Sequence, residues 1–141
     1  MAEERVERHT TSQQEIDDLR GIVARNLHDA SLPELSDDNR FGLAYEAALL
    51  LGKITIACAG YRVKTHGGAH VTTFLALPVA MGKSVEDLAD YFDRCRRKRN
   101  ELSYDAAGVT TRTEAEEILN HARQFQTVVE AWIAKNHPQF R

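Results

Sequence analysis

Apolar residues recur at steps of three and four along most of this chain, which is the spacing of one face of an α-helix. The first such stripe follows Ser12, which with Glu15 has the spacing of a capping box at a helix start. The stripe consists of Ile16, Leu19, Val23 and Leu27. No such pattern precedes Ser12, so we expect residues 1–11 to be a frayed, flexible tail and residues 12–137 to form a single domain.

The second predicted helix, over about residues 39–60, is apolar on two sides, and Ser36 or Asp37 is its expected N-cap. Its stripes are Phe41, Ala44, Ala48, Leu51, Thr55 and Ala59, and Leu43, Ala47, Leu50, Ile54, Ala57 and Tyr61. A helix of this kind belongs at the centre of a bundle or at a subunit interface. Glu46 and Lys53 interrupt its apolar run, which favours a buried core helix over a membrane span.

Three further helices are predicted after a glycine-rich loop. A short apolar helix covers residues 71–82, and Pro78 either ends it or kinks it. Ser84 is the expected N-cap of the next helix, whose inward stripe is Val85, Leu88, Phe92 and Cys95. After a break in which Gly108 suits a turn, Thr113–Glu116 would open the last helix as a capping box. Four or five helices with short connections predict an all-α, up-and-down bundle.

Composition agrees with one domain and gives no global sign of nucleic-acid binding. The 141 residues carry a net charge of −3 and are 43% hydrophobic, which suits a single packed core. The charged N-terminus lacks the apolar segment of a secretory signal. The two cysteines, Cys58 and Cys95, indicate reduced thiols, so we expect a cytoplasmic location. No ligand spacing suggests a metal site, and no metal or other cofactor is expected.

Positive charge is concentrated in the segment Arg94–Arg99 of the stretch RCRRKRNELSYD. Three of its cations can face solvent: Arg94, Arg97 and Lys98. Arg99 instead falls on the inward stripe of its helix, and Arg96 lies one turn earlier at the edge of that stripe. Two neighbouring guanidiniums need an anion. It could be an acid of the same protein, such as Glu46, or an external anion such as phosphate.

Polar groups next to Arg99 could help to bind such an anion. Asn100 and Tyr104 are four residues apart and share a helical face. An arginine, an amide and a phenol can bind a phosphodiester, or they can satisfy a buried helix end. His70 follows a Gly-Gly pair at the start of the third helix, where it could approach this site or serve as a capping or surface residue. The Cys95 thiol is either activated by the nearby cations or buried and inert.

The stretch RCRRKRNELSYD, preceded by AGYR…GGAHVTTF, resembles the HEPN superfamily over about residues 38–135. The resemblance implies a four- or five-helix bundle, usually a homodimer. Many members are metal-independent ribonucleases whose motif is an arginine, a polar residue that is often asparagine, and then a histidine. In those members the two motif copies meet in a basic cleft across the dimer. Several members are toxins paired with a minimal nucleotidyltransferase antitoxin.

The match to that motif is incomplete. Arg99 and Asn100 match its first two positions, but Tyr104 stands in place of the histidine. Histidine is the natural proton-transfer group near pH 7, whereas a phenol with a pKa of about 10 is a weak base. The resemblance therefore supports the fold and the dimer more strongly than it supports RNA cleavage.

Three functions are left open. The first is a non-catalytic or weakly active HEPN-like protein that binds RNA or nucleotide phosphate in a basic dimer cleft. The second is a metal-independent ribonuclease toxin with a nucleotidyltransferase antitoxin as partner. The third is a purely structural dimeric module. No membrane partner is expected. The candidate catalytic residues are Arg99, Asn100 and Tyr104, and the candidate binding residues are Arg96, Arg97 and His70.

Overall fold

The computed structural model describes residues 5–65, 67–104 and 110–141, without the side chains of residues 101–104. Within these ranges the chain forms five α-helices and one two-stranded antiparallel sheet, so the predicted all-α helical bundle is confirmed in outline. The helices are α2 (Gln13–Ala30), α3 (Asp37–Cys58), α4 (Ala69–Met81), α5 (Glu86–Tyr104) and α6 (Arg112–Asn136). The strands are β1 (Val6–Arg8) and β2 (Tyr61–Val63), and the 3-10 turns are η1 (Lys83–Val85) and η2 (Pro138–Phe140).

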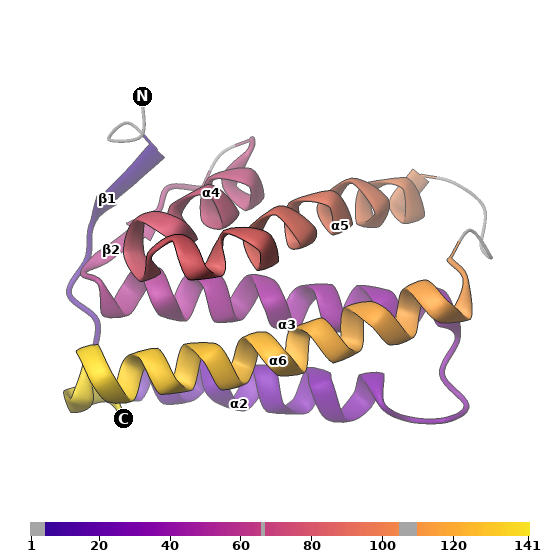
Figure 1. Cartoon of the computed structure of the whole chain (residues 1–141), viewed down its shortest axis with the longest axis horizontal. Helices are drawn as coiled ribbons and strands as arrows, with labels where there is room; N and C mark the ends of the chain where they lie inside the picture. The colour runs from indigo at the N-terminus through magenta and orange to yellow at the C-terminus, as the bar shows by residue number, and fades with distance from the viewer. Residues whose placement is uncertain (1–4, 66, 105–109) are drawn as a thin grey trace.

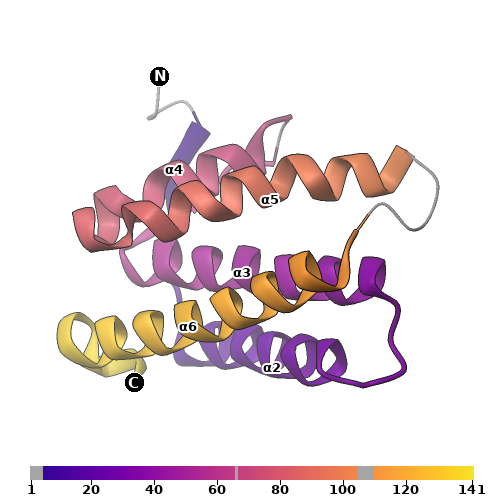
Figure 2. The same ribbon diagram turned by 45° about the vertical axis from the view of Figure 1, so that its right-hand side comes forward.

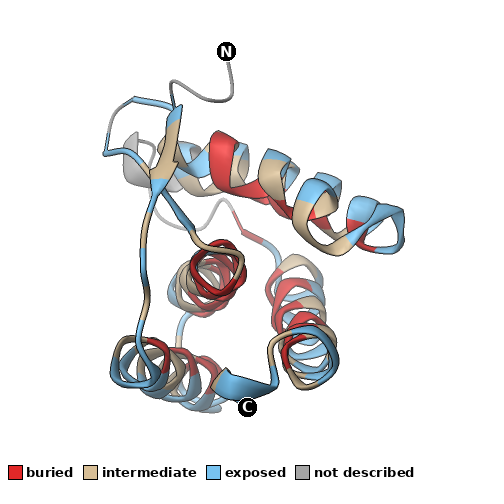
Figure 3. Ribbon diagram, turned by 90° about the vertical axis from the view of Figure 1, so that its left-hand side faces the viewer, coloured by how far each residue is buried: buried red, intermediate tan, exposed pale blue. Residues whose placement is uncertain are grey.

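Helix α3 lies at the centre of the bundle, with α2 and α6 on one side and α4 and α5 on the other (Figures 1 and 2). The end-on view in Figure 3 shows it largely buried, and only Asn39 and Lys53 of its residues are exposed. Its length and apolar composition would allow it to cross a membrane, but 72% of that apolar window is buried inside the bundle. Most residues of the two predicted stripes are thus buried within one chain, whereas Tyr61, the last residue of the second stripe, is exposed and belongs to β2. Helix α3 therefore lies at the bundle centre, which is the first of the two places that the sequence left open for it.

The inward stripes predicted for the other long helices are also found in the core. On α2, Ile16 and Val23 are buried, and on α5 Phe92 is fully buried. The buried residues of α6 are Ala115, Ile118, Leu119, Ala122, Phe125, Val129 and Ile133. Helix α4 adds Phe74 and Leu77 to the same core, and its Pro78 stays inside the helix near the C-terminal end.

Side-chain caps explain where two of the helices begin. The Ser12 side chain accepts a hydrogen bond from the backbone N–H of Glu15, and Ser36 does the same for Asn39, as the sequence predicted. The Glu15 carboxylate does not return a bond to the backbone of Ser12; it binds His9 and Thr11 instead.

Two predicted helix starts are wrong. The capping box of α6 lies two residues earlier than expected, at Thr111 and Glu114, because Thr111 has the same spacing to an acid as Thr113. Ser84 is no N-cap, since it lies in η1, which runs directly into α5. The predicted turn at Gly108 lies outside the described residues.

The N-terminal segment differs from the expected tail. Residues Val6–Arg8 form β1 and pair with β2, so that Val6 is opposite Val63. The ladder continues at both ends, from His9 N to Gly60 O (2.9 Å) and from Lys64 N to Arg5 O (2.8 Å). Gly60 turns the chain from α3 into β2 with a φ of 96°, a value that glycine adopts readily. Three-residue strands are too short for their alternation to be recognised in a sequence.

Candidate anion-binding site

The cations of the basic stretch divide among different sides of α5. Arg94 and Arg97 face solvent as predicted, and the Arg97 side chain is 70% exposed. Lys98 does not: its side chain is 22% exposed, and its Nζ lies 3.6 Å from the Glu114 carboxylate. Arg97, a candidate binding residue, lines neither of the pockets described next.

Arg99 points toward α3 and meets an acid there. Its Nη2 lies 3.5 Å from Glu46 Oε1, so Arg99 meets an acid of the same protein, one of the two anions that the sequence left open. Both groups line a pocket of about 450 Å³, to which Asp38 and Asn39 also contribute. We call it the mixed pocket, because two carboxylates and one guanidinium line it.

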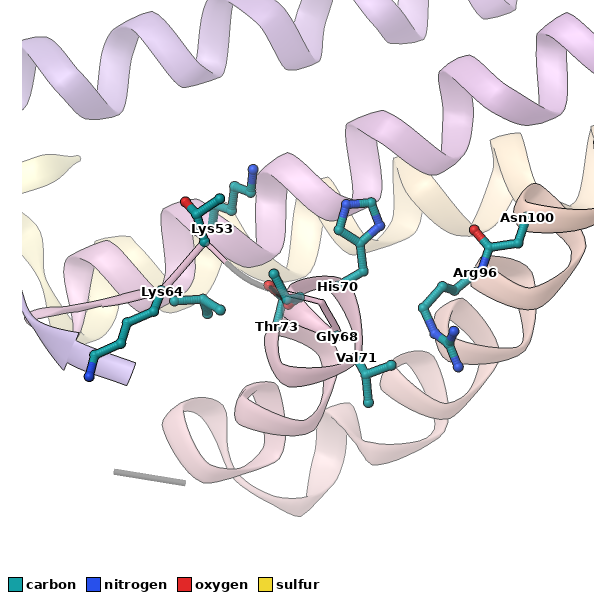
Figure 4. Close-up of a pocket in the computed structure, with 11 residues that line it drawn as sticks. Lys53, Lys64, Gly68, His70, Val71, Thr73, Arg96 and Asn100 are labelled. Atoms are coloured by element: carbon teal, nitrogen blue, oxygen red, sulfur yellow. Dashed lines mark hydrogen bonds between the residues drawn. The ribbon is translucent and has the colours of Figure 1, made fainter. Parts of the chain in front are cut away.

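Arg96 lies one turn earlier on α5 and lines a different pocket, of about 460 Å³ (Figure 4). We call this the basic pocket. The side chains that matter for its chemistry are Lys53, Lys64, His70, Thr73, Arg96 and Asn100. No aspartate or glutamate of the described residues lines it. A concave surface lined in this way carries a positive potential and attracts anions.

The cations of the basic pocket come from three elements that are distant in sequence. Lys53 is an exposed residue of α3, and Lys64 follows β2, where its backbone bonds to Arg5. Arg96 projects from α5, as Figure 4 shows, and its Nε donates a 2.9 Å hydrogen bond to Asp93. The pocket is thus assembled by the tertiary fold and not by the basic stretch alone.

His70 is anchored by a buried tyrosine of α3. The Tyr45 hydroxyl lies 2.9 Å from His70 Nδ1, and Tyr45 is fully buried. Burial raises the pKa of Tyr45 well above its usual value, so the phenol stays protonated. Burial is also the main cause that lowers the pKa of His70, and the charges of Lys53, Arg99 and Arg96 act in the same direction, whereas Glu46 opposes them. The imidazole is therefore neutral at pH 7.

The start of α4 adds backbone donors to the same wall. Gly68 occupies the N-cap position with a φ of 90°, and no side chain of the described residues caps this end. Gly68, Ala69, His70 and Val71 all line the basic pocket. The N–H groups of a first helical turn and the positive end of the helix dipole both favour an anion.

The structure brings together some of the predicted site residues and separates others. Arg96, His70 and Asn100 meet in the basic pocket. Arg99, although it is adjacent to Asn100 in sequence, belongs to the mixed pocket. Tyr104 is the last residue of α5, and its side chain lies outside the described part of the chain.

The sequence did not predict Lys53, Lys64, Thr73 or Tyr45 as residues of the site. The position of Lys53 in an otherwise apolar helix was a usable signal, but it served only to argue against a membrane span. Lys64 carries no signal in the sequence, since the strand pairing places it. Tyr45 is fully buried, and the sequence could not show that its hydroxyl reaches His70.

The cysteines take no part in this chemistry. Cys95 is buried, and burial raises the pKa of its thiol to about 11, although Tyr91 and Arg94 act in the opposite direction. Burial likewise raises the pKa of Cys58 to about 11. The alternative of an activated Cys95 is therefore wrong. Among the side chains that the structure describes, no three of His, Cys, Asp or Glu gather as a metal site would require.

Comparison with known proteins adds no identification: no family model, no curated protein and no solved structure matches this chain.

Proposed function

We propose that this chain is a HEPN-like helical protein that binds the phosphate of RNA or of a nucleotide in the basic pocket and does not cleave it, or cleaves it only weakly. The observation that carries the proposal is that Lys53, Lys64 and Arg96 all line one pocket that no described carboxylate lines. Phosphate contacts of this kind supply most of the affinity of non-specific nucleic-acid binding. Asn100 and His70 add polar groups that can orient the bound anion.

The environment of His70 favours binding over catalysis. A general base near pH 7 is usually an imidazole whose second nitrogen bonds to a carboxylate, which makes the ring more basic. His70 bonds instead to a neutral phenol, and its pKa is lowered. The motif arginine of the resemblance, Arg99, lines the mixed pocket beside Glu46, whereas Arg96 lines the basic pocket, so we assign the anion to Arg96. The alternative function is a ribonuclease toxin, which would cleave RNA.

We place the second copy of the expected homodimer on α4. Leu75 and Val79 are one turn apart on this helix and are 66% and 88% exposed, the highest values among the large hydrophobic residues described. The helix carries no acidic, lysine or arginine side chain, so an identical surface meets it without charge repulsion. Val71, at the start of α4, also lines the basic pocket, which would place the interface next to the site. Val79→Glu should then convert the native dimer into a monomer, which sedimentation would detect as a halved mass. An unchanged mass would show that the dimer interface is not on α4.

The test of the function is a binding and cleavage assay with labelled single-stranded RNA and no added metal. It compares the native protein with Arg96→Gln and, as a matched control, Arg97→Gln. Both changes remove one positive charge from α5, but only Arg96 lines the basic pocket. We expect Arg96→Gln to weaken binding about tenfold or more, the usual contribution of a charge-assisted hydrogen bond, and Arg97→Gln to change it less than about twofold. Native binding should also fall steeply with salt.

Each other result has a clear meaning. If the two changes reduce RNA affinity equally, the basic pocket is not the RNA-binding site. If the native protein yields cleavage products and Arg96→Gln does not, the protein is a ribonuclease and not a binding protein. If the folded native protein binds no RNA and no nucleotide, the proposal is overturned in favour of a structural module.

A further inference from the structure

The composition of the basic pocket narrows its ligand beyond phosphate in general. Resting on the proposed function, we infer that the pocket binds a phosphomonoester, either a free nucleotide or the phosphorylated end of an RNA, in preference to a phosphodiester inside a strand.

The charge of the basic pocket favours a ligand with two negative charges over a ligand with one. Lys53, Lys64 and Arg96 contribute three permanent positive charges, and Asp93, bonded to Arg96 Nε, offsets one of them. Glu46, an acid whose charge acts on His70, is already paired with Arg99. About two positive charges are left to face a ligand. A terminal phosphate carries about −1.5 to −2 at pH 7, whereas a phosphodiester carries a single negative charge.

The hydrogen bond to Tyr45 determines which ring nitrogen of His70 carries the proton. Within the described residues, the hydrogen-bond partner of the buried Tyr45 hydroxyl is His70 Nδ1. If His70 donated to the phenol, the Tyr45 proton would be buried without an acceptor, which is unfavourable. Tyr45 therefore donates, Nδ1 accepts, and the proton of the neutral ring is on Nε2. His70 thus lines the pocket as a hydrogen-bond donor and not as a base.

The hydrogen-bond donors of the pocket match the oxygens of a phosphomonoester. His70, Arg96 and Asn100 all line the pocket, and each of their side chains carries N–H groups that can donate to an anion. A phosphomonoester offers three unesterified oxygens to such donors, and a phosphodiester only two. The volume of about 460 Å³ lies within the range of about 300–1,000 Å³ that is common for small-ligand sites, so a nucleotide fits.

The test compares three RNA oligonucleotides of one sequence, with a 5′-phosphate, a 3′-phosphate or no terminal phosphate, at one salt concentration. We expect one of the phosphorylated forms to bind at least about tenfold more tightly than the unphosphorylated RNA, as an added charge and an added charge-assisted bond imply. AMP and adenosine serve as competitors. Competition by AMP but not by adenosine would indicate a free nucleotide as the source, and competition by phosphorylated RNA alone would indicate an RNA end.

Two variants test the role of the Tyr45–His70 pair. Tyr45→Phe removes the phenol hydroxyl and should reduce the preference for the phosphorylated form several-fold, while Tyr61→Phe makes the same chemical change at an exposed tyrosine of β2 and should leave it intact. If Tyr45→Phe does not fold, His70→Ala tests the same donor. Equal affinity of the native protein for all three RNAs would overturn this inference and leave phosphate binding in place. If the native protein binds none of the three RNAs and does not bind AMP, the proposed function itself is overturned.

Discussion

The two pockets beside α5 have nearly the same volume, about 460 and 450 Å³, and opposite electrostatic character. Arg96 lines the first and Arg99 the second, although the two residues are one helical turn apart. Neighbouring residues of α3 account for part of the difference: Tyr45 bonds to His70 of the basic pocket, and Glu46 pairs with Arg99 in the mixed pocket. The role of an arginine here depends on the group that faces it across the bundle, and not on its place in a motif.

The largest effect should come from reversing one charge of the basic pocket. Lys53→Glu removes a cation and introduces a carboxylate at an exposed position of α3, so the fold should tolerate it. We expect roughly a 100-fold loss of affinity for RNA, because unit charges a few ångströms apart interact by a few kcal/mol at the effective dielectric constant of a protein surface. Lys135→Glu, the same change at an exposed position of α6, is the control. An equilibrium titration that shows less than about a fivefold difference between them would contradict the contrast between the two pockets.

A smaller effect is expected from pH. Inorganic phosphate gains its second negative charge around neutral pH, so its affinity should rise roughly tenfold from pH 5 to pH 8. Protonation of His70 would act with the opposite sign, since it adds positive charge at low pH. The groups around His70 are Tyr45, Glu46 and Lys53 on α3, and Arg96 and Arg99 on α5. Its lowered pKa places its titration below the usual value for histidine.

The control for this pH series is inorganic sulfate, whose charge does not change over the same range. Calorimetry at each pH should show a rise for phosphate and a flat profile for sulfate. If both affinities increase as the pH falls, a protonated imidazole is part of the site, and the neutral donor assigned to His70 is wrong.

The smallest effect concerns the ion pair of the mixed pocket. Arg99 and Glu46 are 37% and 38% exposed, and a double-mutant cycle in urea should give a coupling energy of about 0.2–1 kcal/mol, as for other partly exposed pairs. The affinity for RNA should change less than about twofold in Arg99→Ala. The pair Arg20–Glu130 is a useful reference with two hydrogen bonds of 2.9 and 2.8 Å, and its coupling should be larger. A tenfold loss of RNA affinity in Arg99→Ala would show that the anion binds to Arg99, the arginine of the motif, and not to Arg96.

Much of the bundle could be predicted because its information is local. The stripe from Ile16 to Leu27 and the caps at Ser12 and Ser36 depend on residues a few positions apart, and the structure confirms them. Even the pairing of Arg99 with Glu46 was one of the two alternatives that the helical wheels offered, since an acid in an apolar helix needs a partner.

The basic pocket could not be predicted in the same way because its parts come from separate elements. Lys64 contributes only because β2 pairs with β1, and neither short strand has a recognisable pattern. The contact between Tyr45 and His70 depends on how α4 packs on α3, which no local spacing determines. Helical periodicity shows which side of a helix is buried, but it does not show which other helix lies there.

The pairing of β1 with β2 has a consequence for how the site forms during folding. It joins Arg62 and Glu7, which are 55 residues apart in the chain, through a 2.6 Å ion pair. Closing so long a loop in the unfolded chain is entropically costly, but once α2 packs against α3 only short connections separate the strands. We therefore expect the wall that carries Lys64 to form late, after the α2–α3 hairpin. During refolding, the ability to bind an anion should then be recovered no earlier than the helical core.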